Sequence, residues 1–102
     1  AGATVSPAEV EAALERHPRV HAACVVPAPD PTRGEVVVAF VVADPEIDEA
    51  ALRTHCRAEL AAYKVPRHFF FRSEEEFPRT GTRKPDKLRL RAEAAALLGG
   101  AA

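Results

Sequence analysis

The feature that most constrains the fold is an almost wholly apolar run at residues 35–42, EVVVAFVV. It lacks the alternation of a half-exposed strand, so it predicts a strand covered on both faces or nearly so. Two further runs read as strands, VHAACVV at residues 20–26 and HFFFR at residues 68–72. The segment at residues 27–35 predicts a turn-rich connection, with Asp30 as a turn former and Gly34 at a positive φ.

Three segments have helical signatures. Ser6 and Glu9 form a capping box with Pro7 at the first helical position, so we expect a helix that stops near His17. Asp48 caps a second helix, which runs to about residue 62 and carries an apolar stripe of Leu52, Cys56, Leu60 and Tyr63. In this interpretation Tyr63 packs in the core with its hydroxyl at the rim.

The last helix is expected from about residue 85 to residue 96, with two glycines ending it. With 102 residues, one domain is the natural reading. The order of elements is helix, strand, strand, helix, strand, helix. This order predicts an α+β fold in which a small three-stranded sheet is packed with about three helices.

Composition narrows the functional classes. The first 52 residues carry 3 basic and 9 acidic side chains, a net of −6, and the rest carry 11 and 6, a net of +5. The second half is therefore disposed to meet an anion. There is no apolar run of membrane-spanning length and no signal-like start, so we expect a cytoplasmic protein without a membrane partner. Cys24 and Cys56 read as buried, unbridged thiols, and the four histidines lack metal-ligand spacing, so no metal site is expected.

The basic residues concentrate in the stretch FPRTGTRKPDKLRLR at residues 77–91. It opens with turn formers and continues into a helix, since proline and aspartate suit a first helical turn. Lys84 is thus expected on a loop just ahead of a helix, where its long stem can present a point charge to a phosphate. The plainer interpretation is a solvated basic loop.

This stretch resembles the closing motif of the adenylate-forming (AMP-binding) enzymes, which include the acyl-CoA synthetases. The motif reads P-(R/K)-(T/N)-x-(T/N)-G-K-(I/V)-x-(R/K), then Leu-Arg. The positions that fit are Pro78, Arg79, Thr80, Thr82, Lys84, Lys87, Leu90 and Arg91. The invariant lysine of the family falls on Lys84, whereas Arg83 stands where the family has glycine.

Three other segments match the family in order. GATVSPAEVE, from Gly2, is similar to the end of the hinge motif, although the hinge residue and short strand before it are not in the sequence. VVPAPDPTRGEVVVAFVV contains Asp30, Gly34 and Glu35 at fixed family positions, and LAAYKVP matches a third pattern. Acid–base or metal chemistry at Asp30 and Glu35 is the alternative to the structural roles that we prefer for them.

The resemblance implies the small C-terminal domain at residues 1–98, with 99–102 as a disordered tail and the large N-terminal domain absent. In this family the domain turns between two half-reactions, acyl-adenylate formation from ATP and transfer to a thiol. It implies that Lys84 is catalytic. We also expect Arg83, Lys87 and Gly2 to contact nucleotide or substrate. Because Arg83 departs from the family glycine, either the loop takes a different path or Arg83 joins the site with a second phosphate contact. ATP, with Mg in the full enzyme, and coenzyme A would be substrates, with none bound by this domain alone. The isolated chain is expected to be an inactive part of an acid–thiol ligase.

Two alternatives differ in the partner. The chain could instead belong to a peptide-synthetase adenylation enzyme that loads a carrier protein, because Asp86 and Lys87 resemble that branch's ending. It could also be a small basic module that binds nucleic acid through residues 79–91. That module would need aromatic side chains between its basic residues, and none is present, so we expect no nucleic-acid partner.

Overall fold

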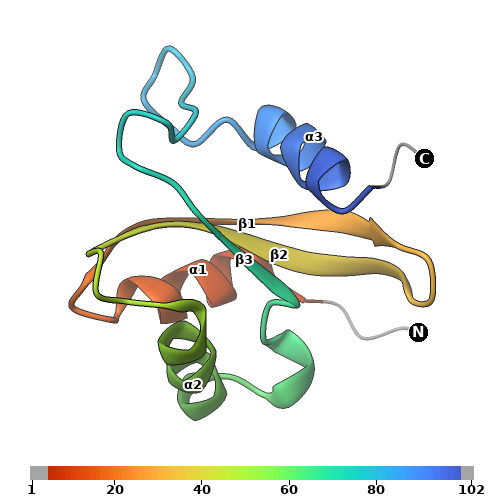
Figure 1. Ribbon diagram of the computed structural model, residues 1–102, viewed down its shortest axis with the longest axis horizontal. Helices are drawn as coiled ribbons and strands as arrows, with labels where there is room; N and C mark the ends of the chain where they lie inside the picture. Colours follow the sequence, from red (N-terminus) through yellow and green to blue (C-terminus); the bar gives the residue numbers. More distant parts are fainter. Residues whose placement is uncertain (1–4, 100–102) are drawn as a thin grey trace.

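The computed structural model describes residues 5–99 and has three helices around a three-stranded sheet (Figure 1). The elements are α1 (Pro7–Glu15), β1 (Val20–Asp30), β2 (Gly34–Ala43), α2 (Glu49–Glu59), the 3-10 turn η1 (Ala62–Lys64), β3 (His68–Phe71) and α3 (Lys87–Leu97). The predicted α+β class and the order of the main elements are confirmed. The separate turn η1 was not foreseen.

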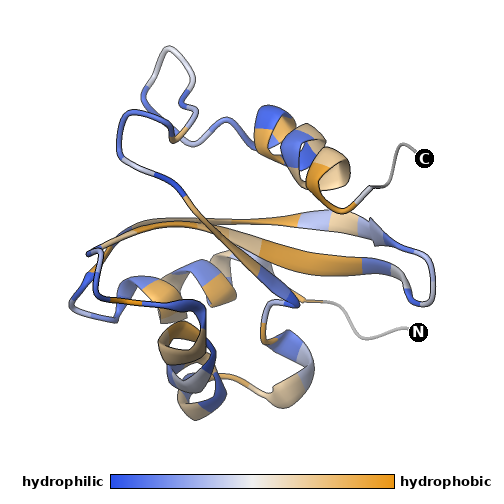
Figure 2. Ribbon diagram, viewed as in Figure 1, coloured by the Kyte–Doolittle hydropathy of each residue, from blue (hydrophilic) through white to orange (hydrophobic). Residues whose placement is uncertain are grey.

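The central strand of the sheet is β2, which pairs antiparallel with β1 and parallel with β3. Helices α1 and α2 cover one face, and α3 covers the other (Figure 1). Val41 packs with Val10 and Leu52 on the first face, whereas Phe40 packs with Leu90 on the second. Both faces of β2 are therefore buried, which explains its apolar run, and Figure 2 shows the strand as almost continuously hydrophobic.

Strand β1 is longer than predicted and runs through Pro27 and Pro29 to Asp30. The prediction of a connection from residue 27 was wrong because β1 is an edge strand, where proline loses no ladder hydrogen bond. The outward N–H groups of Ala23 and Val25 donate to carboxylates of α1, and the next two residues of the same parity are these prolines. The exposed edge of β1 thus presents few free donors to another strand.

The helix starts were predicted well. Ser6 accepts a hydrogen bond from the Glu9 N–H at 3.4 Å, with Pro7 at the first turn of α1. Asp48 accepts from the Ala51 N–H at 2.9 Å and caps α2. The start of α3 falls later than expected, since Asp86 is the N-cap and the helix begins at residue 87.

The end of α2 departs from the prediction. The helix stops at Glu59 because Leu60 adopts extended geometry, with ψ at 153°. The chain then forms η1, so Tyr63 leaves the helical stripe and its side chain is 57% exposed. The prediction that Tyr63 packs in the core was therefore wrong, whereas Leu52, Cys56 and Leu60 are buried as expected.

Two local predictions about the β1–β2 turn are confirmed. Asp30 accepts hydrogen bonds from the Thr32 and Arg33 N–H groups, each at 2.9 Å, and Gly34 has a φ of 82°. Cys24 and Cys56 are free and fully buried, in the two different clusters of the core. No helix within residues 5–99 is long and apolar enough to cross a membrane.

Candidate functional site

The segment at residues 77–86, here called the lysine loop, is a small hairpin ahead of α3. An isolated bridge pairs Arg79 with Pro85. The Thr80 N–H donates to the Lys84 carbonyl at 2.8 Å, and the Arg83 N–H donates back to the Thr80 carbonyl at 2.9 Å. These bonds close a tight turn, so the backbone that carries Lys84 is held in place.

Arg83 adopts a left-handed conformation, with a φ of 67°. It is the one non-glycine residue with positive φ in the described part of the chain. A left-handed residue after a tight turn is typical of hairpins with a bulge, and glycine is preferred there. The loop therefore keeps a glycine-like path although arginine occupies the position, at a cost of about 1–2 kcal/mol.

Arg79 ties the lysine loop to the rest of the domain. Its Nη1 donates to the Arg83 carbonyl at 3.2 Å, and its Nη2 donates to Glu74 Oε1 at 2.9 Å. Its guanidinium lies 5.0 Å from the ring centroid of Phe77, which is buried in the core cluster under α3. Arg79 thus links the backbone of Arg83 and Lys84 to the buried core.

The three lysines of the chain differ in their partners. Lys64 Nζ lies 2.9 Å from Glu9 Oε1, and this hydrogen bond raises the pKa of Lys64. Lys87 Nζ lies 3.0 Å from Glu11 Oε2. The Lys84 side chain is exposed, and its ammonium makes no hydrogen bond or ion pair with the rest of residues 5–99. Three of the predicted site residues, Arg83, Lys84 and Lys87, lie in or just after the lysine loop. Among residues 5–99, only Lys87 of these three has an acidic partner. Gly2 lies outside the described residues.

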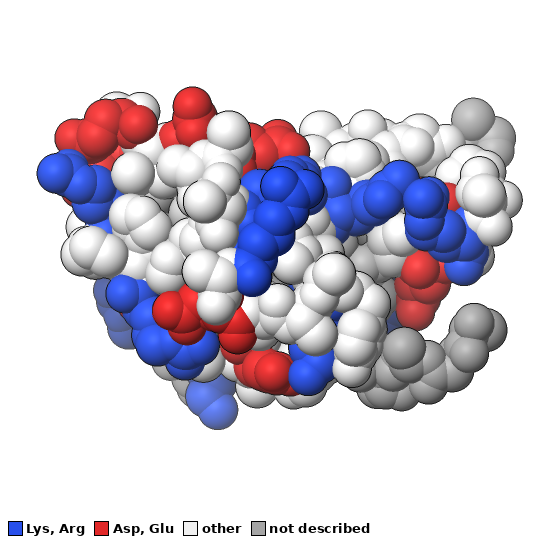
Figure 3. Space-filling model, turned by 90° about the horizontal axis from the view of Figure 1, so that it is seen from below, with Lys and Arg blue, Asp and Glu red and all other residues white. Residues whose placement is uncertain are grey.

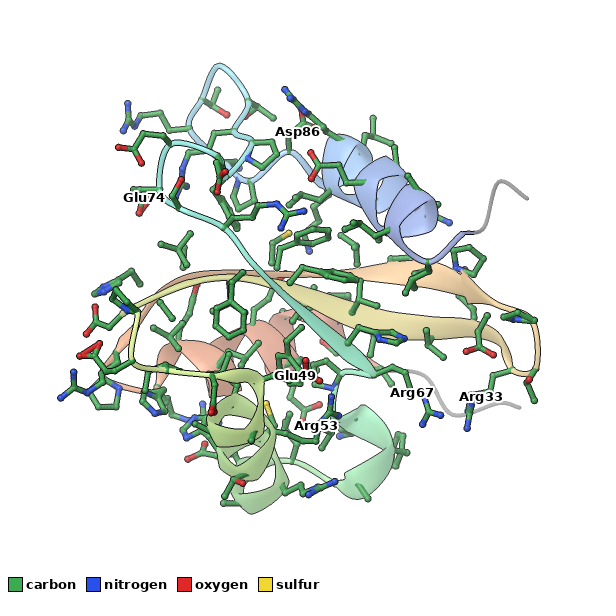
Figure 4. The ribbon with its side chains drawn as sticks, in the orientation of Figure 1. Arg33, Glu49, Arg53, Arg67, Glu74 and Asp86 are labelled. Carbon is green, nitrogen blue, oxygen red and sulfur yellow. The ribbon has the colours of Figure 1, made fainter. Side chains whose placement is uncertain are left out.

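A second candidate surface lies on the α1 and α2 side of the sheet, which sequence reasoning missed. It is an open hollow of about 660 Å³, and its lining includes Tyr63 and Ala62 of η1, Val36 and Val37 of β2, and the charged residues Arg33, Glu35 and Arg67. Figure 4 shows Arg33 and Arg67 near each other at the β1–β2 turn end of the sheet. The break between α2 and η1 places Tyr63 at this hollow. The prediction from sequence missed it because the expected helix continued to residue 62.

The carboxylates considered for acid–base work have structural partners. Hydrogen bonds from the Arg33 and Thr32 N–H groups lower the pKa of Asp30, as expected of a turn former. Glu35 lies 3.9 Å from Arg91. No group of three metal-ligating side chains occurs among residues 5–99. Acidic and basic side chains both occur on the face seen in Figure 3, and neither sign covers it.

Comparison with known proteins decides the family. A model of the AMP-binding enzyme C-terminal domain matches residues 9–84. The chain belongs to this family. It is 47% identical over 92 residues to a peroxisomal trans-cinnamate:CoA ligase of Petunia hybrida, a match that covers 88% of this chain and 16% of that protein.

Solved structures agree. A Mycobacterium tuberculosis fatty acyl CoA synthetase superposes with a TM-score of 0.86 at 37% identity, over 94% of this chain and 19% of that one. An anthranilate CoA ligase in complex with anthranoyl-AMP gives 0.83 at 37% identity, over 96% of this chain and 20% of that one. The chain thus spans about a fifth or less of each relative and corresponds to one domain of a larger enzyme.

Proposed function

We propose that the chain is the mobile C-terminal domain of an AMP-forming acyl-CoA synthetase and that Lys84 serves its first half-reaction. A carboxylate oxygen attacks the α-phosphorus of ATP, the bond to pyrophosphate breaks, and an acyl-adenylate forms. A thiol then attacks the acyl carbonyl, and AMP leaves. The observation that carries the proposal is the exposed Lys84 ammonium, without an acidic partner in residues 5–99, on a loop fixed by backbone hydrogen bonds.

The role of Lys84 is electrostatic. Negative charge converges where the substrate carboxylate meets the α-phosphoryl oxygens, and a fixed cation stabilises that charge without reorganising during the reaction. An ammonium suits this task because it is a compact charge on a long stem. An ion pair would already have neutralised Lys84 before the nucleotide arrived. Lys84 positions and neutralises, and it takes no proton.

The hollow beside Tyr63 favours coenzyme A as the acceptor. The exposed ring can stack on an adenine, and Arg67, which unlike Arg33 has no carboxylate within 4 Å among residues 5–99, can meet a phosphate. A carrier protein brings a thiol arm without an adenine ring, so this surface gives it less to recognise. The lysine loop lies on the α3 side of the sheet and η1 on the other (Figure 1), so turning the domain would exchange the two surfaces. ATP, with Mg in the full enzyme, would be the other substrate.

The test uses the full-length enzyme that carries this domain. Lys84→Ala should slow ATP–pyrophosphate exchange by about 10²- to 10³-fold, the usual effect of one preorganised charge. It should leave thiol transfer from a pre-made acyl-adenylate far less affected. Arg57→Ala is the control, because Arg57 lies on α2, across the sheet from the lysine loop.

The acceptor is tested separately. Tyr63→Ala and Arg67→Ala should raise the KM for coenzyme A by about tenfold, the value of one base-stacking or charged contact, and leave exchange intact. Equal slowing of both half-reactions by Lys84→Ala, or of neither, would contradict the assignment of Lys84. A loss of exchange in Lys87→Ala instead would move the catalytic cation along the chain. An unchanged KM for coenzyme A would favour a carrier protein.

A further inference from the structure

Arg83 combines an unfavourable backbone with a free charge. Its left-handed conformation is one that asparagine or glycine adopts more readily. Retaining arginine there costs stability and gains no contact inside the domain, because its guanidinium makes no hydrogen bond or ion pair with residues 5–99. Strained residues that persist without an internal benefit are found mainly at functional sites.

The carboxylates beside the lysine loop are already engaged. Glu74 binds Arg79, and the Asp86 carboxylate accepts the Arg89 N–H at 3.2 Å. Both acids are labelled in Figure 4, at the two ends of the loop. Eight of the eleven arginines have a carboxylate within 4 Å, whereas Arg83, like Arg57 and Arg67, has none among residues 5–99. Arg83 and Lys84 therefore present two adjacent, uncompensated positive charges.

We propose that Arg83 is a second anion-binding residue of the lysine loop and contacts a phosphate oxygen of the nucleotide during acyl-adenylate formation. This inference rests on the function proposed for Lys84. A guanidinium can donate two parallel hydrogen bonds to a phosphate, which adds orientation to the point charge of the lysine. The hydrogen bond from Arg79 to the Arg83 carbonyl fixes the backbone from which the guanidinium extends.

The experiment separates the charge of Arg83 from its backbone strain. In the full-length enzyme, ATP–pyrophosphate exchange and the KM for ATP are measured for Arg83→Gln, Arg83→Gly and Arg83→Lys. Arg57→Gln is the matched control, since Arg57 is also exposed and without an ion pair in residues 5–99. Thermal melting of each variant reports whether the loop change disturbs folding.

We expect Arg83→Gln and Arg83→Gly to lower kcat/KM for ATP by about 10- to 100-fold, the range for a hydrogen bond between charged groups. Arg83→Lys should recover only part of this loss, because it keeps the charge but not the two parallel hydrogen bonds. Arg83→Gly should melt higher than the parent because the strain is relieved. Thiol transfer from a pre-made acyl-adenylate should be unchanged in all three.

Two outcomes overturn the inference. Exchange at the parent level in Arg83→Gly and Arg83→Gln would show that the guanidinium is merely solvated. A loss in Arg83→Gly alone would point to loop rigidity and away from charge. If Lys84→Ala also leaves exchange intact, the proposed function itself fails, so the two failures are distinguishable.

Discussion

Glu11 joins three parts of the domain through a single carboxylate. Its Oε2 accepts a hydrogen bond from the Val25 N–H at 2.8 Å, and the same oxygen lies 3.0 Å from Lys87 Nζ. Glu11 belongs to α1, Val25 to the edge strand β1, and Lys87 to the first turn of α3. Replacing Glu11 with alanine therefore removes the link between the two helices and leaves the partly buried Val25 N–H without its acceptor.

The size of the effect follows from these contacts. A hydrogen bond to a charged acceptor is worth about 1.5–3 kcal/mol when its loss leaves a buried donor unpaired. The ion pair adds about 0.2–1 kcal/mol, because the Lys87 side chain is half exposed. Glu11→Ala should therefore lower the free energy of unfolding by about 2–4 kcal/mol. For a domain of this size, that corresponds to a fall in Tm of roughly 8–30 °C.

The assay is urea unfolding of the chain, followed by circular dichroism, on a matched set of variants. Lys87→Ala removes only the ion pair and should cost at most about 1 kcal/mol. Glu11→Gln keeps an oxygen acceptor and should fall between the two. Glu15→Ala is the comparison on the same edge of β1. Glu15 accepts a longer hydrogen bond, 3.3 Å from the Ala23 N–H, and forms no ion pair with a lysine of residues 5–99. A cost for Glu11→Ala no larger than that for Lys87→Ala would refute the reasoning, because the edge hydrogen bond would then contribute nothing.

Three further predictions concern the chain itself. Gly34→Ala should destabilise the chain by about 1 kcal/mol or more from backbone strain alone, because Gly34 has a positive φ and an added Cβ meets nothing within 4 Å. Gly81 is equally open but has no positive φ, so Gly81→Ala should be near neutral in the same unfolding assay. Burial raises the pKa of both Cys24 and Cys56 from 9.0 to about 11, so between these values the folded state keeps protons that the unfolded state loses. The stability that the two buried thiols contribute is therefore fully present below pH 9 and should decline as the pH rises towards 11. The double alanine variant, unfolded at the same pH values, should not show this decline. The isolated chain should catalyse no ATP–pyrophosphate exchange with a panel of carboxylic acids, and robust turnover would contradict the interpretation as one domain of a larger enzyme.

The sequence predicted the fold where local signals agreed with burial. The apolar run of β2 required cover on both faces, and the capping residues Ser6 and Asp48 marked helix starts. It failed at β1, where Pro27 and Pro29 are turn formers by local chemistry. Only the pairing of the strand shows that their missing N–H groups face away from β2. The pairing of β1 with β2 cannot be read from the sequence of residues 27–30 alone.

The candidate site was predictable to a similar degree. Lys84 was placed on a loop ahead of a helix from turn and cap residues, and the geometry agrees. Tyr63 was assigned to the core because its spacing from Leu60 continues a helical stripe. The extended geometry at Leu60 breaks that helical stripe, although no residue from Leu60 to Tyr63 is a strong helix breaker and the next proline is Pro66. The hollow beside η1 therefore could not be predicted from helical periodicity, because it depends on where the folded chain leaves α2.

The two candidate surfaces lie on opposite sides of one sheet, and the sheet explains how both can stay formed. The lysine loop is referred to the core cluster under α3 through Arg79 and Phe77. The hollow with Tyr63 is built on Val36 and Val37 of β2, so both surfaces share the central strand. A closely packed interior with β2 buried on both faces resists internal deformation. In the proposed reaction, exchanging one surface for the other then requires rotation of the whole domain, and each half-reaction meets a surface that is already formed.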